Sequence, residues 1–212
     1  MPKDFKQKYN FEVANLAVLR SISPDLQMDE HAKLTLNEMT HECAVKICGA
    51  IGKLMKDSEA ITIDSRAIQE ATKLILSDEM QNATITAANK AVTKYTSSDN
   101  GTKANPVTKS SRAGLLYPVS RCRHILKECV AGANKRIGDA APVYLAATLQ
   151  FIMSDVLELA ANNVQDTKRI RMGRKDLVAA VKQDEGLNEL FSGVFSVYSL
   201  PDIHVSFLPK PK

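Results

Sequence analysis

Apolar residues recur every three or four positions along two long segments of the chain, one in each half. In the second half, no glycine or proline interrupts residues 143–166, and Pro142 stands where the first turn of a helix tolerates proline. The apolar positions of this segment have helical spacing; they are Val143, Ala147, Leu149, Ile152, Met153, Val156, Leu157, Leu159, Ala160 and Val164. At 1.5 Å per residue the helix is about 37 Å long, so shorter helices must cross it on both sides.

The first half repeats this plan. Residues 29–56 form the second long pattern, with apolar positions at Leu36, Met39, Cys43, Ile47, Cys48, Ile51 and Leu54. Gly49 and Gly52 fall inside it, and we expect them to allow close packing of another helix. Shorter helices are predicted at 9–21, 66–76 with Ser65 as N-cap, 77–95 and 174–183, and an extended piece at 61–63. Residues 99–110 are polar and turn-rich, which indicates a flexible linker.

Several stretches carry a family resemblance. Residues 140–147 (AAPVYLAA), 168–171 (KRIR) and 184–190 (DEGLNEL) resemble the 2A-type core histone. Residues 89–98 (NKAVTKYTSS) resemble the 2B-type core histone. The chain as a whole therefore resembles the histone doublets of giant DNA viruses, of the marseillevirus type, in which these two histones are fused.

The resemblance implies an all-α fold class, with two histone folds in one chain forming an intramolecular pseudo-heterodimer, the handshake pair. The expected domains are a 2B-type fold at 1–98, the linker at 99–110, and a 2A-type fold with a carboxy-terminal docking segment at 111–212. The implied function is structural: wrapping and packaging DNA without sequence specificity, in nucleosome-like particles. The implied partners are double-stranded DNA and a second doublet that supplies the 3-type and 4-type histones.

Site residues follow from the resemblance position by position. The expected DNA contacts are Arg112, Arg121, Arg136, Lys168, Arg169, Arg171 and Thr62. The expected acidic patch, which docks basic proteins, is Glu79, Asp155, Glu158, Asp184 and Glu185. The expected docking segment for the partner histones is Tyr198, Leu200, Ile203, Phe207 and Leu208. In place of the basic pair that the 2B type carries in its second loop, this chain has Glu59 and Ala60, which predicts a weaker grip on DNA there.

Charge is divided unevenly along the 212 residues. The net charge of +4 comprises −1 over residues 1–97 and +5 over residues 98–212. This basic excess is compatible with binding a polyanion but modest for DNA packaging. The sequence has neither an 18-residue apolar run nor an apolar signal core at its start, so we expect no membrane association and no secretion. The expected location is intracellular and reducing: the virion and the host nucleus or viral factory.

Four cysteines, Cys43, Cys48, Cys122 and Cys129, match no zinc spacing. A metal site at Cys122, His124 and Cys129 is an alternative, but reduced cysteines that pack in the core are favoured. No catalytic motif or cofactor motif is present, and we expect neither an enzyme nor a small-molecule substrate. A histone-fold interaction module of a transcription or replication complex, which binds proteins and touches DNA little, stays open as the alternative function.

Overall fold

The computed structural model describes residues 9–56, 61–98, 107–129 and 135–196. In the first half the elements are α2 (Glu12–Ile22), β1 (Gln27–Met28), α3 (Glu30–Lys56), β2 (Thr62–Ile63), α4 (Ser65–Lys73) and α5 (Asp78–Ser97). In the second half they are α6 (Lys109–Ala113), α7 (Val119–Cys129), β3 (Arg136–Ile137), α8 (Ala141–Asp166), β4 (Arg171–Met172), α9 (Arg174–Gln183) and α10 (Glu185–Ser196). The protein is mostly helical, as the apolar periodicity predicts.

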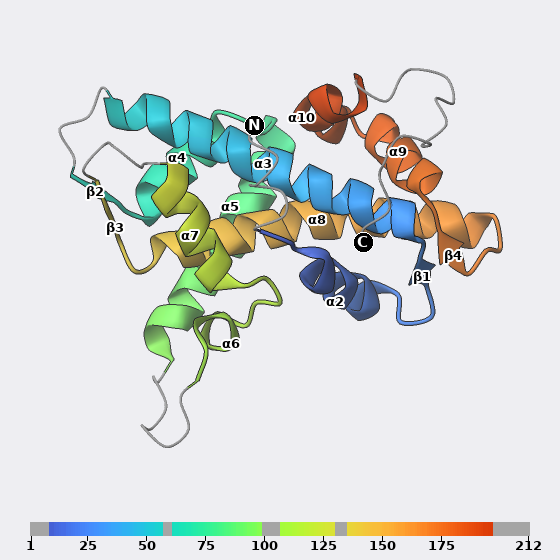
Figure 1. Cartoon of the computed structure of the whole chain (residues 1–212), viewed down its shortest axis with the longest axis horizontal. Coiled ribbons are helices and arrows are strands. Elements are labelled where there is room, and N and C mark those ends of the chain that lie inside the picture. The colour runs from blue at the N-terminus through green and yellow to red at the C-terminus, as the bar shows by residue number, and fades with distance from the viewer. Residues whose placement is uncertain (1–8, 57–60, 99–106, 130–134, 197–212) are drawn as a thin grey trace, which may run out of the picture.

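Two long helices, α3 and α8, run in opposite directions beside each other through the molecule (Figure 1). The shorter helices α2, α4, α5, α7 and α9 all pack on α8, which confirms that shorter helices cover its apolar stripe. By length and composition α8 could also cross a membrane, although 67% of its most apolar window is buried inside the protein. Its apolar face is thus accounted for by packing, as in the core helix of a globular protein.

Two short parallel bridges join the halves of the chain at opposite ends of the α3–α8 pair (Figure 1). β1, which precedes α3, pairs with β4, which follows α8. β2, which follows α3, pairs with β3, which precedes α8. The pairing follows from the opposite directions of the two long helices, because the start of one lies beside the end of the other.

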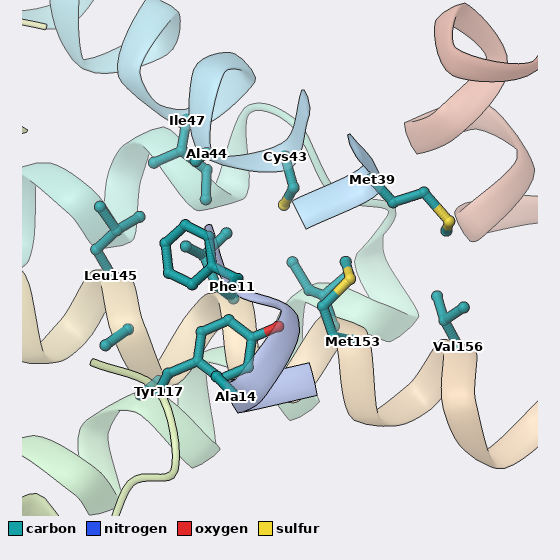
Figure 2. Close-up of a cluster of buried hydrophobic side chains, with 14 of the residues drawn as sticks. Phe11, Ala14, Met39, Cys43, Ala44, Ile47, Tyr117, Leu145, Met153 and Val156 are labelled. Atoms are coloured by element: carbon teal, nitrogen blue, oxygen red, sulfur yellow. The ribbon is translucent and has the colours of Figure 1, made fainter. Parts of the chain in front are cut away.

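The core between the halves is built from both of them (Figure 2). Phe11 of the first half is fully buried and stacks on Tyr117 of the second, with ring centroids 5.4 Å apart. The Tyr117 hydroxyl donates to the side-chain oxygen of Asn15, whose amide donates to Thr40 Oγ1 at 3.3 Å. Burial raises the pKa of Tyr117, so the hydroxyl stays a hydrogen-bond donor. A buried polar group with a partner is stabilising, and this one ties the second half to α2 and α3.

Element boundaries differ from the prediction at a few capping positions. The first helix begins at Glu12 rather than at Tyr9, because the Phe11 backbone N–H donates to Asn37 Oδ1 at 2.8 Å. The N-cap of α4 is Asp64, which accepts from the Ala67 N–H at 2.9 Å; Ser65 is already helical. Helix α6 begins at Lys109, inside the stretch expected to be linker, while residues 99–106 lie outside the described residues.

The expectation that all four cysteines are reduced is wrong for two of them. Cys48 of α3 and Cys129 of α7 form a disulfide, with 5.8 Å between their Cα atoms. They are 81 residues apart in the chain and meet because α7 packs on α3. The Cys129 sulfur is therefore committed to this bond rather than to a metal site with Cys122 and His124. Cys43 and Cys122 are free and fully buried, and burial raises the pKa of each thiol to about 12.

The expectation that Gly49 and Gly52 allow close helix packing is also wrong, since a Cβ at either position would meet no atom within 4 Å.

An interior helical glycine costs conformational entropy without packing gain. We therefore expect Gly49→Ala and Gly52→Ala each to raise the free energy of unfolding by about 0.5–1 kcal/mol, measured by urea denaturation. Gly114→Ala is the opposite control: the φ of Gly114 is +68°, which favours glycine, and the added Cβ would collide with Lys94 Nζ. This substitution should therefore lower the free energy of unfolding. Equal effects at all three positions would contradict this explanation.

Candidate nucleic-acid interface

The β2–β3 bridge brings together one expected DNA contact from each half. Thr62 is the register partner of Arg136, and both side chains are exposed. The Arg136 backbone N–H donates to the Ile61 carbonyl at 2.8 Å, and that of Gly138 donates to the Ile63 carbonyl at 2.8 Å. A Cβ on Gly138 would approach this carbonyl to 3.2 Å, so the bridge needs a small residue there. Thr62 and Arg136 are therefore exposed neighbours at one end of the molecule.

The β1–β4 bridge forms the corresponding surface at the opposite end. Here Arg171 is the register partner of Gln27, and both are exposed. The Gln27 N–H donates to the Ile170 carbonyl at 2.9 Å, and the Asp29 N–H donates to the Met172 carbonyl at 3.0 Å. Lys168, which precedes β4 in the same loop, is exposed and has a left-handed backbone conformation, with φ of 54°. The first half supplies a neutral residue to each end, whereas the second half supplies the arginine.

Arg169, in the same loop, has an ion pair inside the molecule. Its guanidinium donates to both carboxylate oxygens of Asp176, at 2.6 and 3.1 Å. Burial opposes ionisation of Asp176, but hydrogen bonds from Arg169 and from the Gly173 N–H hold its pKa below its usual range. The hydrogen bond to Asp176 in turn raises the pKa of Arg169. Of the expected basic strip, Lys168 and Arg171 therefore carry charge that this carboxylate does not neutralise.

Between the two ends, α7 places Arg121 next to the start of α2. Its guanidinium donates to the Asn10 carbonyl, so the arginine is anchored to the other half of the chain. Arg121 is partly exposed. This hydrogen bond holds the positive charge of Arg121 in place between the two bridges.

Arg112, also expected to contact DNA, is placed differently. Its guanidinium lies 4.3 Å from the centre of the Tyr95 ring and donates to the carbonyls of Tyr95 and Ser98 at 3.0 and 3.1 Å. It is only partly exposed, and its buried Nε has no hydrogen-bond partner among the residues that the structure describes. These contacts hold α6 against the end of α5. The Arg112 side chain therefore has a structural role inside the protein.

Asp139 gathers further cations beside Arg112. Its carboxylate accepts from Lys109 and from the Tyr95 hydroxyl, and Arg123 lies 3.7 Å away. The hydrogen bond from Lys109, then that from Tyr95, lowers the pKa of Asp139. This group and the Arg169–Asp176 pair are not predicted from the sequence, because the residues of each meet only when the chain folds.

Acidic residues gather in a groove of about 510 Å³ between the halves. Glu79 comes from α5, Asp155 from α8, Asp184 from the turn before α10, and Glu185 from α10 itself; Met80 and Phe151 add apolar lining. Burial, and then the charges of Asp184 and Glu158, raise the pKa of Asp155. Four of the five expected acidic-patch residues thus line one groove, and the fifth, Glu158, is close enough to act on Asp155. Glu189 is an additional acid there.

The remaining predicted sites lie outside the described residues. These are Glu59 and Ala60 and the docking positions Tyr198, Leu200, Ile203, Phe207 and Leu208.

A short helix, a long helix crossed by its neighbours and a further short helix, with the loops paired at both ends, is the arrangement of a histone-fold protein. Residues 97–183 match the family model of the core histone domain, which is shared by the 2A, 2B, 3 and 4 types of histone. Over 114 residues the chain is 43% identical to a type 2A histone of Pisum sativum, an alignment that covers 53% of this chain and 75% of that histone. The chain therefore belongs to the core histone family.

Proposed function

We propose that this histone is a doublet, in which residues 1–98 form a 2B-type histone fold that pairs with the 2A-type fold of residues 111–212. The bridges between loops, the shared core around Phe11 and Tyr117, and the contact of α5 and α4 with α8 support this pairing. A covalent linker makes the pairing intramolecular and raises the effective concentration of each half toward the millimolar range. The order of the halves supports a doublet of the giant-virus type.

We further propose that the doublet is a structural chromatin protein that binds double-stranded DNA without reading its sequence. The observation that carries this is the placement of exposed arginines at the two bridge ends, Arg136 and Arg171, with Arg121 anchored between them. Cations spaced along the protein can pair with successive phosphates of a DNA duplex. An arginine can also enter the minor groove where this groove faces the protein. Thr62 and Lys168 would add phosphate contacts beside these arginines.

We propose that the acidic groove docks basic segments of other proteins. Its carboxylates converge on one opening, and Phe151 and Met80 provide apolar surface for an arginine stem. A second doublet that supplies the 3-type and 4-type histones would complete a nucleosome-like particle, with residues 198–208 docking on it. Packaging of viral DNA in the virion, the nucleus or the viral factory would be the biological role.

Nuclease protection tests the function directly. The chain is mixed with duplex DNA, with and without a partner doublet, and digested with micrococcal nuclease. We expect a discrete protected length that requires both doublets. DNA digested at the same rate with and without protein would overturn the DNA-packaging proposal, and would favour the protein-interaction module instead.

The acidic groove leads to a separate prediction. Glu79→Gln with Asp155→Asn should weaken the binding of an arginine-rich peptide by roughly tenfold, since each ion pair near the surface contributes up to about 1 kcal/mol. Because the pKa of Asp155 is raised, wild-type binding should also fall as the pH is lowered, and Asp155→Asn should reduce this dependence.

Titration calorimetry at low salt measures both effects. The matched control is Glu30→Gln with Glu70→Gln, which removes the same charge from exposed positions on α3 and α4. An equal loss in the control would show that the peptide responds to net charge and not to the groove.

A further inference from the structure

A disulfide connects the two halves of the chain in addition to the backbone that joins them. Cys48 lies in the last third of α3, and Cys129 is the last residue of α7. Their Cα separation of 5.8 Å is within the range that an unstrained disulfide requires. The bond joins the long helix of the first half to the helix of the second half that precedes α8.

The pair differs from the other two cysteines in its access to small reagents. Cys43 and Cys122 are fully buried, and burial raises their thiol pKa to about 12, so their thiolates hardly form. Cys129 is partly exposed at a helix end, and Cys48 retains 6% exposure beside it. Thiol–disulfide exchange needs an accessible thiolate and a second thiol within bonding distance, and only this pair among the four cysteines has both.

We infer that Cys48 and Cys129 are a reversible oxidation site whose disulfide locks the two halves of the chain together, with a low-molecular-weight disulfide such as oxidised glutathione as the oxidant. The Cys129 thiolate attacks one sulfur of the oxidant, which forms a mixed disulfide and releases one glutathione thiolate. The Cys48 thiolate then attacks the Cys129 sulfur and releases the second. The two cysteines lose two protons and two electrons, and one glutathione disulfide becomes two glutathione molecules.

The Cys48–Cys129 disulfide affects how firmly the two halves are held together, whereas the proposed DNA contacts do not depend on this disulfide. In the reduced chain the halves are held by packing and by the linker. In the oxidised chain they are inseparable even when the linker is cut. Closing a loop of about 80 residues restricts the unfolded chain, which should raise the melting temperature by up to about 10 °C.

The test uses the full chain with a protease site replacing residues 99–106. Samples are equilibrated in glutathione mixtures from fully reduced to fully oxidised, quenched in acid and alkylated under denaturing conditions. Mass spectrometry should find Cys48 and Cys129 protected together as the mixture becomes oxidising, with Cys43 and Cys122 alkylated throughout. After linker cleavage, a non-reducing denaturing gel should show the halves as one species, and a reducing gel should show two.

Cys48→Ser and Cys129→Ser should each give two species on both gels and a melting temperature that is independent of the reductant. Cys122→Ala is the matched control, because it removes a cysteine but keeps the pair and should still lock. A disulfide mapped to Cys43 or Cys122, or free thiols at Cys48 and Cys129 in fully oxidised glutathione, would overturn the inference. DNA affinity of the serine variants, measured in parallel, keeps this result separate from the proposed function.

Discussion

Alanine at both Arg136 and Arg171 is expected to weaken binding to duplex DNA by roughly 10- to 100-fold near physiological salt. Each arginine is exposed at one bridge end, and each would neutralise one phosphate. Removing two phosphate contacts should lower the slope of log affinity against log salt concentration by about two units, because about 0.9 counterions are released per contact. The loss should be the same for unrelated DNA sequences, since phosphate contacts carry no sequence information. Fluorescence anisotropy over a salt series measures both quantities.

A matched control separates position from charge. Lys90→Ala with Lys182→Ala also removes two positive charges, from exposed sites on α5 and α9 that lie outside both bridges. This control should change the salt slope much less than the arginine pair does. Equal slopes for the two double variants would mean that the DNA responds to net charge alone, and that the bridge ends are not the contact points.

Arg169 shows why the position of a basic residue in a predicted DNA-binding loop does not suffice to predict a DNA contact. Its position in residues 168–171 matches the family's basic strip, but its guanidinium is held by Asp176, seven residues later. Between them the chain passes through β4 and turns into α9, so the pair forms only in the folded loop. In the same way, Arg112 is positioned by the Tyr95 ring and two carbonyls from the other half. The sequence identifies the charges, whereas the fold decides which of them are paired inside the protein.

Much of the helical architecture follows from the sequence because it depends on local patterns. The apolar period and the unbroken stretch after Pro142 predict α8, and the predicted helix 174–183 matches α9 (Arg174–Gln183). The N-cap of α4 was less predictable, since Asp64 and Ser65 are adjacent and both are good N-cap residues. In the structure Asp64 has the extended backbone of an N-cap, and Ser65 is already helical. The Cys48–Cys129 bond could not be predicted from spacing, because its 81-residue separation is bridged only by the packing of α7 on α3.

The distribution of charge has a consequence for the proposed particle. The first half contributes Gln27 and Thr62 to the two bridge ends, and its own net charge is −1. Electrostatic attraction to DNA therefore comes chiefly from the second half, whose cations are partly neutralised by Asp139 and Asp176. The total number of released counterions should consequently be small for a histone pair, and the binding should depend less steeply on salt. The pairing of the two halves therefore places Arg136 and Arg171 of the second half beside Thr62 and Gln27 of the first, which are neutral and can form hydrogen bonds.

Phe11→Ala is expected to lower the free energy of unfolding by about 3–5 kcal/mol, measured by urea denaturation in the presence of reductant. Phe11 is fully buried, stacks on Tyr117 from the other half and meets the His41 ring edge-on at 5.8 Å. Truncation leaves a cavity where the halves meet, so hydrogen exchange should increase in α8 as well as in α3. In a double-mutant cycle with Tyr117→Ala the coupling should be about 0.5–1.5 kcal/mol, as for other aromatic pairs.

Val13→Ala is the control for this substitution, because Val13 lies only two residues further along, in the first turn of α2, but is 78% exposed. It should change stability by less than about 0.5 kcal/mol. The distribution of the exchange response tests the pairing of the halves. If Phe11→Ala loosens α2 and α3 but leaves the protection of α8 unchanged, the two halves unfold independently, and the proposed intramolecular pair is wrong. If both long helices lose protection together, the buried contact between Phe11 and Tyr117 joins them into one cooperative unit, as two histone folds sharing one core require.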